Sequence, residues 1–219
     1  MNRLSERMDQ RLALYKAAPM AVSRRLWEES DLTRTYPALL KLQLDTIRAS
    51  SDLMDLAAQA LEANPADPLS SELAAYYRHH AEEERGHVAW VVEDLARVGV
   101  PSEALAGRLP SPLAAALVGA QYYWIRQAHP CALLGYLISL EWATPDPAVF
   151  EAASLRSGWP PEAFTCFRRH AQLDPGHRAD MEVLLDRLPF TEAQEALMGL
   201  SLLHSCTAVA ALLEGALVS

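Results

Sequence analysis

A long run of apolar residues at helical spacing, over residues 36–61, is the feature that most restricts how this chain can fold. Leucine, isoleucine, methionine and alanine recur three and four positions apart along this segment, and that spacing is typical of a helix with one buried face. Pro65 and Pro68 follow it and end the pattern. A helix of this length has to bury its apolar stripe against several other helices.

The rest of the chain repeats this pattern in shorter segments separated by proline, glycine or asparagine. We expect further helices over residues 4–16, 20–30, 71–98, 112–128, 131–142, 147–156, 161–188 and 191–217. Alanine and leucine dominate, glycine is scarce, and no segment alternates apolar and polar residues as a half-buried strand does. The sequence therefore predicts an all-α fold, with one domain over residues 1–219 packed as a bundle of about seven helices.

Charge and cysteine content restrict the partners and the compartment. The formal net charge of −9 argues against nucleic acid or an anionic membrane surface as a partner. The apolar stretch over residues 197–213 is interrupted by a histidine, so we expect a buried terminal helix rather than a membrane span. Residues 1–12 lack the apolar core of a signal peptide. Cys131, Cys166 and Cys206 are unclustered, as is typical of reduced thiols in a cytoplasmic protein.

Residues 170–177 contain two histidines and an aspartate at helical spacing, His170, Asp174 and His177. At 3.6 residues per turn, positions i, i+4 and i+7 share one stripe of a helix. We therefore expect the two imidazole groups and the carboxylate to point toward one place. Such a ligand set suits iron or manganese better than a structural zinc ion. A solvated polar face is the alternative interpretation.

A second group of such residues lies on the expected helix 71–98. His80, Glu84 and His87 fall on one stripe of this helix, and Asp94 lies in phase with them. Glu84 and His87 alone are a weak signal, because such pairs are common on solvated helix faces. Five of the seven histidines in the chain, however, lie in two short windows that also hold carboxylates in phase. Two such helices packed together would form a metal site in the core of a bundle.

Glu141 ends the otherwise apolar segment 131–142. A carboxylate on such a helix is expected to be nearly buried, and a buried carboxylate has to be paired, protonated or bound to a metal ion. The alternative is a glutamate at a solvent-facing helix end. If it is buried, Glu141 is suited to bridge two metal ions.

With these residues in place, the sequence resembles the haem-oxygenase-like diiron oxidases and oxygenases, the iron-containing redox enzyme family. The matching stretches are HAEEERGHVAWVVEDL (80–95), LLGYLISLE (133–141) and HAQLDPGH (170–177). The resemblance implies a haem-oxygenase-like helical bundle that holds iron, as Fe(II) and Fe(III), at a site for two ions and uses O2 as co-substrate. The metal ligands it implies are His87, Glu141, His170, Asp174 and His177.

The remaining carboxylate ligand stays open at this point. Members of the family place it at different turns of the first ligand helix. Glu84 matches one arrangement, and His80 occupies a position that is glutamate in another. Asp45, Asp52 and Asp55 on the preceding helix are further carboxylates, but none of them aligns with a ligand position. Whether the second iron is firmly held is therefore also open.

The resemblance implies a small-molecule substrate, either amino-acid-like or fatty-acid-like. Family members carry out N-oxygenation, desaturation or oxidative C–C cleavage, and a homodimer is compatible with the resemblance. The side chains that we expect to contact substrate are Tyr76, Tyr123, Arg126 and Tyr136. Arg126 would pair with a substrate carboxylate. A solvated charge and ordinary core packing are the alternatives for these residues.

Two other functions compete with the diiron enzyme. The same bundle resembles the thiaminase II and pyrroloquinoline-quinone synthase group, which uses no metal, and Cys131 before Tyr136 is similar to the thiaminase nucleophile region. That group would not need His170 and His177 in register with Asp174. A non-enzymatic helical binding protein is the third interpretation. Ferritin-like diiron proteins are disfavoured because they use two Glu-x-x-His pairs.

Overall fold

The structure is a computed structural model that describes residues 3–142 and 144–219. Every regular element in these two ranges is a helix. The α-helices are α1 (Leu4–Tyr15), α2 (Ala17–Arg24), α3 (Leu32–Glu62), α4 (Ser70–Glu84), α5 (His87–Arg97), α6 (Pro112–Gln127), α7 (Ala132–Glu141), α8 (Pro147–Ser157), α9 (Thr165–Arg187) and α10 (Glu192–Val218). The all-α prediction is confirmed.

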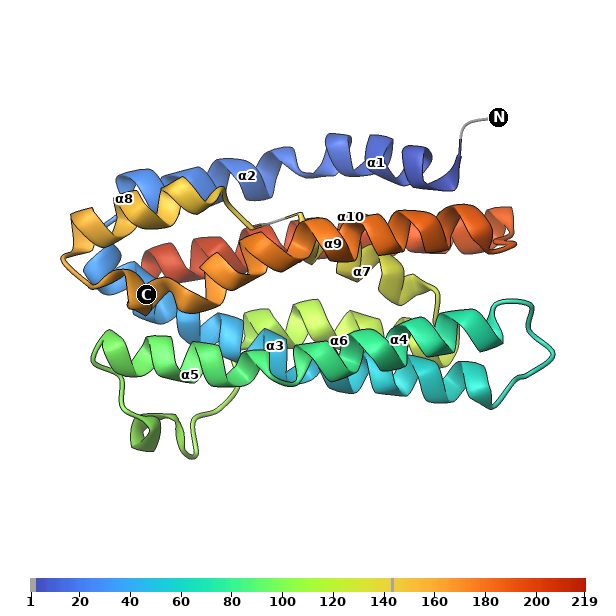
Figure 1. Cartoon of the computed structure of the whole chain (residues 1–219), viewed down its shortest axis with the longest axis horizontal. Helices are drawn as coiled ribbons and strands as arrows, with labels where there is room; N and C mark the ends of the chain where they lie inside the picture. The colour runs from blue at the N-terminus through green and yellow to red at the C-terminus, as the bar shows by residue number, and fades with distance from the viewer. Residues whose placement is uncertain (1–2, 143) are drawn as a thin grey trace.

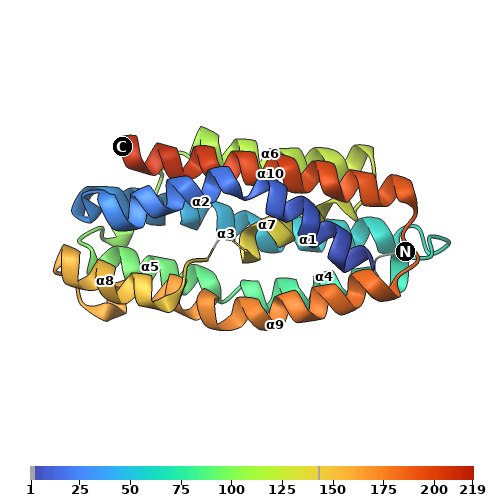
Figure 2. The ribbon, with the colours of Figure 1, turned by 90° about the horizontal axis from the view of Figure 1, so that it is seen from above.

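Three short helical segments join these elements. They are the π-helical η1 (Arg25–Glu29) and the 3-10 helices η2 (Ser102–Leu105) and η3 (Pro161–Phe164). The long helices run side by side along the longest axis of the molecule, with α3 against α4 and α10 against α7 (Figure 1). Seen from above, α7 lies between the pair α10 and α6 and the pair α9 and α4 (Figure 2).

The longest helix begins earlier than its apolar pattern predicts. α3 starts at Leu32 because the side chain of Asp31 accepts a hydrogen bond from the Thr33 amide and so satisfies a free N–H at the helix start. Pro37 lies inside this helix, within its first two turns. A proline there removes one helical hydrogen bond. The sequence prediction began the helix at residue 36 because the apolar spacing begins there.

The predicted helix 71–98 is wrong as one continuous helix. The chain forms α4 and α5, separated at Arg85 and Gly86. Both residues keep right-handed helical backbone angles, so α5 continues along the same side of the bundle as α4 (Figure 1). The interruption places Glu84 at the end of one helix and His87 at the start of the next.

α10 is the one helix within 3–142 and 144–219 that is long and apolar enough to cross a membrane, by length and composition. Half of its most apolar window is buried inside the bundle, where the helix packs against α7, α2 and α6. Gly135 of α7 marks the closest approach, because a Cβ atom there would lie 2.3 Å from the Met198 carbonyl oxygen. This packing agrees with a buried terminal helix.

The start of α9 is held by a buried carboxylate of α5. Asp94 is fully buried, and its oxygens accept hydrogen bonds from the amides of Thr165 (3.2 Å) and Cys166 (2.8 Å). These are two of the amides that a helix N-terminus leaves without partners. Burial raises the pKa of Asp94 to about 7, while the two amide hydrogen bonds oppose that shift. Asp94 therefore fixes the position of α9 on α5.

Replacing Asp94 with alanine should lower the free energy of unfolding by about 1–3 kcal/mol, because two buried amides would lose their acceptor. Urea unfolding followed by circular dichroism measures the change. The control is Glu93→Ala, one residue away, since the Glu93 side chain is 58% exposed and forms only a surface ion pair with Arg97. We expect a change below about 0.5 kcal/mol there. Equal effects at both positions would contradict the capping role.

Candidate metal centre

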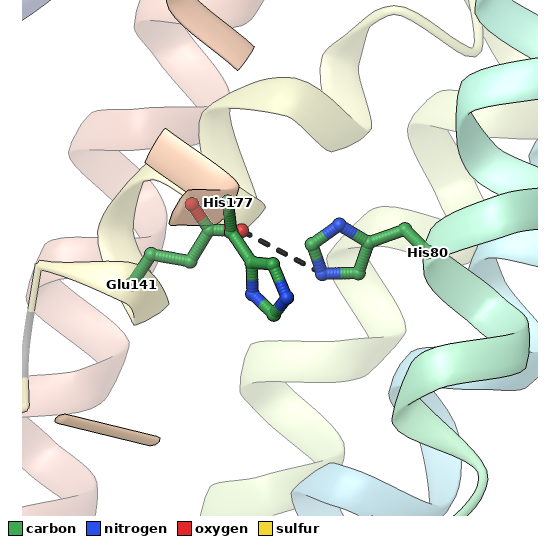
Figure 3. Close-up of side chains that lie close together, drawn as sticks. All are labelled: His80, Glu141 and His177. Carbon is green, nitrogen blue, oxygen red and sulfur yellow. Dashed lines mark ion pairs between the residues drawn. The ribbon is translucent and has the colours of Figure 1, made fainter. Parts of the chain in front are cut away.

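The first group of metal-ligating side chains comes from three helices that meet in the bundle. His80 of α4, Glu141 of α7 and His177 of α9 point toward one another (Figure 3). Each offers one ligand atom, and the three atoms lie within 4.8 Å of one another. The Nε2 atom of His80 is 3.6 Å from Oε1 of Glu141. His80 and Glu141 are buried, and His177 is half-buried.

The second group consists of Glu84, His87 and His170, whose ligand atoms also lie within 4.8 Å of one another. His87 Nδ1 is 3.0 Å from Glu84 Oε2. His170 Nδ1 donates a hydrogen bond to the Cys166 carbonyl oxygen at 2.8 Å. Because that bond places the proton on Nδ1, Nε2 is left as the atom that can bind a metal. The ring of His87 stacks on Trp90 with centroids 4.0 Å apart, which restricts its rotation.

The two groups adjoin. His80 Nε2 of the first group lies 3.8 Å from Glu84 Oε1 of the second. Each group consists of two histidines and one carboxylate, the donor set that non-haem Fe(II) oxygenases use. Side chains that are far apart in the sequence therefore form one site that consists of two adjoining donor groups.

This arrangement corrects the expectation that His170, Asp174 and His177 point toward one place. His170 belongs to the second group and His177 to the first. Seven residues along a helix correspond to a rise of about 10 Å, which separates the two rings although they share a stripe. Asp174 lies between them in sequence and joins neither group of adjacent ligand atoms. It is 5% exposed, and it lines a cavity together with His80, Glu84, Glu141 and His170.

Glu141 is the residue that tests whether the site fits a metal ion. Both of its carboxylate oxygens are buried and have no hydrogen-bond partner among the residues that the structure describes. Burial, with Asp174 and Glu84 nearby, raises the pKa of Glu141 to about 9. Burial and the neighbouring His177 lower the pKa of His80 to about 4, so its imidazole is neutral. A neutral His80 imidazole beside a carboxylate that has no hydrogen-bond partner in the described part of the chain suits a bound cation.

Burial also raises the pKa of Asp174 to about 7. The other carboxylates that the sequence analysis named as further candidates lie elsewhere. Asp45 pairs with Arg108, and Asp55 pairs with Arg78 (2.7 Å) and Arg85 (2.6 Å). Asp94 holds the start of α9, and Asp52 is exposed. None of these four contributes to either donor group.

Of the four residues expected to contact substrate, Tyr76 and Tyr136 lie near the donor groups, and Tyr123 and Arg126 do not. Tyr76 lies beside His80, with ring centroids 5.7 Å apart, and its buried hydroxyl has no hydrogen-bond partner among the described side chains and backbone. Tyr136 is fully buried, and its hydroxyl hydrogen-bonds to Ser50 at 2.7 Å. Ser50 lines the cavity that contains the donor groups.

Tyr123 and Arg126 do not reach the site. Both are exposed on the outer face of α6, Tyr123 by 64%, and neither lines a cavity beside the donor groups. The buried face of α6 carries Val118, Gln121 and Ile125 instead. The sequence could not identify this orientation because apolar and aromatic residues lie on both sides of the helix.

Two adjoining cavities give access to the donor groups. The inner cavity, of about 100 Å³, is lined mainly by apolar side chains together with His80, Glu84, Glu141, His170 and Asp174. The outer cavity, of about 450 Å³, shares Glu141 and Asp174 with it. The outer wall also contains Lys16, Trp142 and Arg178, which sequence reasoning did not identify. Trp142 and Arg178 directly follow the predicted ligands Glu141 and His177, whereas Lys16 has no such signal in the sequence.

A family model described as "Iron-containing redox enzyme" matches residues 51–204 of this sequence. The chain belongs to the iron-containing redox enzyme family. The matched range includes every residue of both donor groups. No curated protein matches the sequence.

Solved structures with the same fold accompany this family assignment. A domain of unknown function with a haem oxygenase-like fold from Shewanella denitrificans OS217 is 17% identical, with a TM-score of 0.83 over 96% of this chain and 90% of that one. A TenA homologue from Pseudomonas syringae pv. tomato DC3000 is 13% identical, with a TM-score of 0.76 over 98% and 92%. A TenA homologue from P. horikoshii OT3 is 9% identical, with a TM-score of 0.64 over 99% of both chains. This member of the iron-containing redox enzyme family therefore has the haem-oxygenase-like all-α fold.

Cys131, the candidate nucleophile of the metal-free interpretation, is unsuited to that role in this family member. Its side chain is fully buried, and burial raises the pKa of the thiol to about 12. It lines neither the inner nor the outer cavity. A nucleophilic cysteine needs an accessible thiolate.

Proposed function

We propose that this chain is an iron-dependent oxidoreductase that uses O2 and holds two iron ions, one in each donor group. The observation that carries the proposal is Glu141, a buried carboxylate whose two oxygens have no hydrogen-bond partner in residues 3–142 and 144–219, and which belongs to one of two adjoining histidine and carboxylate donor groups. Membership of the iron-containing redox enzyme family supports iron as the metal. Bound iron would supply the redox chemistry with O2 that side chains alone do not provide.

The residues of this chain would position the metal and keep water away from it. The Cys166 carbonyl fixes the tautomer of His170, and Trp90 holds the ring of His87. Such contacts behind a ligand set its orientation and its basicity. The apolar walls of the inner cavity exclude bulk water from the donor groups.

The cavity lining also bears on the substrate. We propose a small substrate, amino-acid-like or fatty-acid-like, that undergoes N-oxygenation, desaturation or oxidative C–C cleavage. Leucine, isoleucine, methionine and phenylalanine side chains line the inner cavity together with the donor groups, so the part of the substrate nearest the donor groups is apolar. This lining favours a fatty-acid-like substrate. The buried thiol of Cys131 weighs against the metal-free hydrolase.

Anaerobic titration with Fe(II) tests the function. We expect two Fe(II) ions per chain, measured by calorimetry and by metal analysis after desalting, followed by oxidation of both ions when O2 is admitted. Mg²⁺ is the control, because it prefers oxygen ligands and should not compete at sites with two histidines each. Failure to retain any iron would reject the proposal and leave a metal-free enzyme or a binding protein.

A further inference from the structure

Two cationic side chains lie over the indole ring of Trp142 at the wall of the outer cavity. Lys16 Nζ is 3.8 Å from the centroid of the indole ring, and Arg178 Cζ is 4.3 Å from it. Lys16 follows α1, Trp142 follows α7 and Arg178 is part of α9. Three parts of the chain that are far apart in sequence thus converge beside Glu141, which lines the same cavity.

All three side chains are hydrogen-bond donors, and none of them has an acceptor among the residues that the structure describes. Among the described residues, no carboxylate oxygen lies within ion-pair distance of Lys16 or Arg178, although Arg178 is close enough to Glu141 and Asp174 to lower their pKa values against the rise that burial causes. The indole N–H of Trp142 is buried and has no acceptor within the described parts of the chain. Buried donors of this kind normally have a partner.

We propose that Lys16, Arg178 and Trp142 form the binding site for the carboxylate of the substrate, whose apolar chain then extends into the inner cavity. The proposal rests on the proposed function and names the substrate class as an alkyl monocarboxylate. Two cations and an N–H donor suit a carboxylate because charge-assisted hydrogen bonds are the strongest that a protein offers an anion. The two cavities adjoin, because Glu141 and Asp174 line both of them.

The charges of the outer cavity favour a singly charged anion. Lys16, Arg24 and Arg178 line it, but so do four acidic residues. These are Glu28, Glu141, Asp146 and Asp174. These acids would repel a phosphate dianion more strongly than a singly charged carboxylate. The two cations beside Trp142 would repel an ammonium group.

The experiment measures ligand binding to the metal-free protein in the presence of a chelator. The probe is octanoate, and the comparison ligands with the same chain are 1-octanol, octylamine and octyl phosphate. Calorimetry gives the affinities, and the ¹⁵N–¹H signal of the Trp142 indole, assigned with Trp142→Phe, reports binding at this wall. We expect octanoate to bind at least about tenfold more tightly than 1-octanol and octylamine and to shift the indole signal. Tighter binding of octyl phosphate or octylamine would overturn the carboxylate assignment.

The variants Lys16→Met and Arg178→Met should each weaken octanoate binding by about tenfold or more and leave the affinity for 1-octanol unchanged. Arg169→Met is the matched control, because Arg169 is also on α9 and also lies over a tryptophan, Trp90, but does not line the cavity. We expect it to bind octanoate as the unchanged protein does. If Lys16→Met, Arg178→Met and Arg169→Met all bind octanoate with the same affinity, the proposed carboxylate site is wrong.

Folding and iron binding are checked separately. Arg178→Lys keeps the charge, so it should retain more octanoate affinity than Arg178→Met, and this comparison stands even if the methionine variant folds poorly. Normal iron uptake with no octanoate binding would reject the carboxylate site alone. Octanoate binding without iron uptake would reject the proposed oxidoreductase and keep the carboxylate site.

Discussion

His170→Ala and His177→Ala are each expected to lower the affinity for one of two iron ions by more than about a hundredfold, since loss of residues that merely support a ligand costs 10–100-fold. His170 belongs to the group with Glu84, and His177 to the group with Glu141. Each variant should therefore retain at most one iron, and the double variant none. The helices should stay folded, because the rings lie at the site rather than in the apolar core.

His79→Ala is the matched control for these variants. His79 is adjacent to His80 on α4, but its side chain is 75% exposed and belongs to neither donor group. It should leave the iron stoichiometry and affinity unchanged. Metal analysis after anaerobic loading, with circular dichroism to check folding, measures the outcome. Two irons per chain in both His170→Ala and His177→Ala would show that the ligand assignment is wrong.

Gly135→Ala should be the most destabilising single methyl addition in the bundle core. The added Cβ would lie 2.3 Å from the Met198 carbonyl oxygen and 2.7 Å from the Leu202 amide nitrogen, and both are backbone atoms of α10. Backbone atoms cannot move aside as a flexible side chain can, so α7 and α10 have to separate. We expect the free energy of unfolding to fall by about 3 kcal/mol or more.

Gly119→Ala is the matched control, because Gly119 is also inside a helix, α6, but no atom lies within 4 Å of its added Cβ. Alanine should raise the free energy of unfolding there by about 0.5–1 kcal/mol through helix propensity. Urea unfolding curves of the two variants should therefore shift in opposite directions. A shift of Gly135→Ala toward higher stability would contradict the close packing of α7 on α10. Because α7 also carries Glu141, the same variant should weaken iron binding.

Much of the fold follows from periodicity in the sequence. Apolar spacing over residues 36–61 and the proline breaks after it predict α3 and its end, and similar patterns predict the other long helices. Several predicted boundaries differ from the structure, and two of them show local causes. Asp31 caps α3 earlier than the apolar pattern begins, and the chain interrupts the predicted helix 71–98 at Gly86. Apolar spacing could not predict the cap or the interruption, because neither of them changes which face of the helix is apolar.

The sequence by itself predicted a set of candidate metal ligands, of which Asp174 joins neither donor group, and it determined which of them share a helix stripe, because helical spacing depends only on residue number. His80, Glu84, His87, Glu141, His170 and His177 all reach the two donor groups. Spacing says only that a face is buried, not which helix covers it. Packing of α4, α5, α7 and α9 therefore decided that His170 and His177 join different groups, that Tyr123 and Arg126 face outward, and that Lys16, Trp142 and Arg178 meet at one wall.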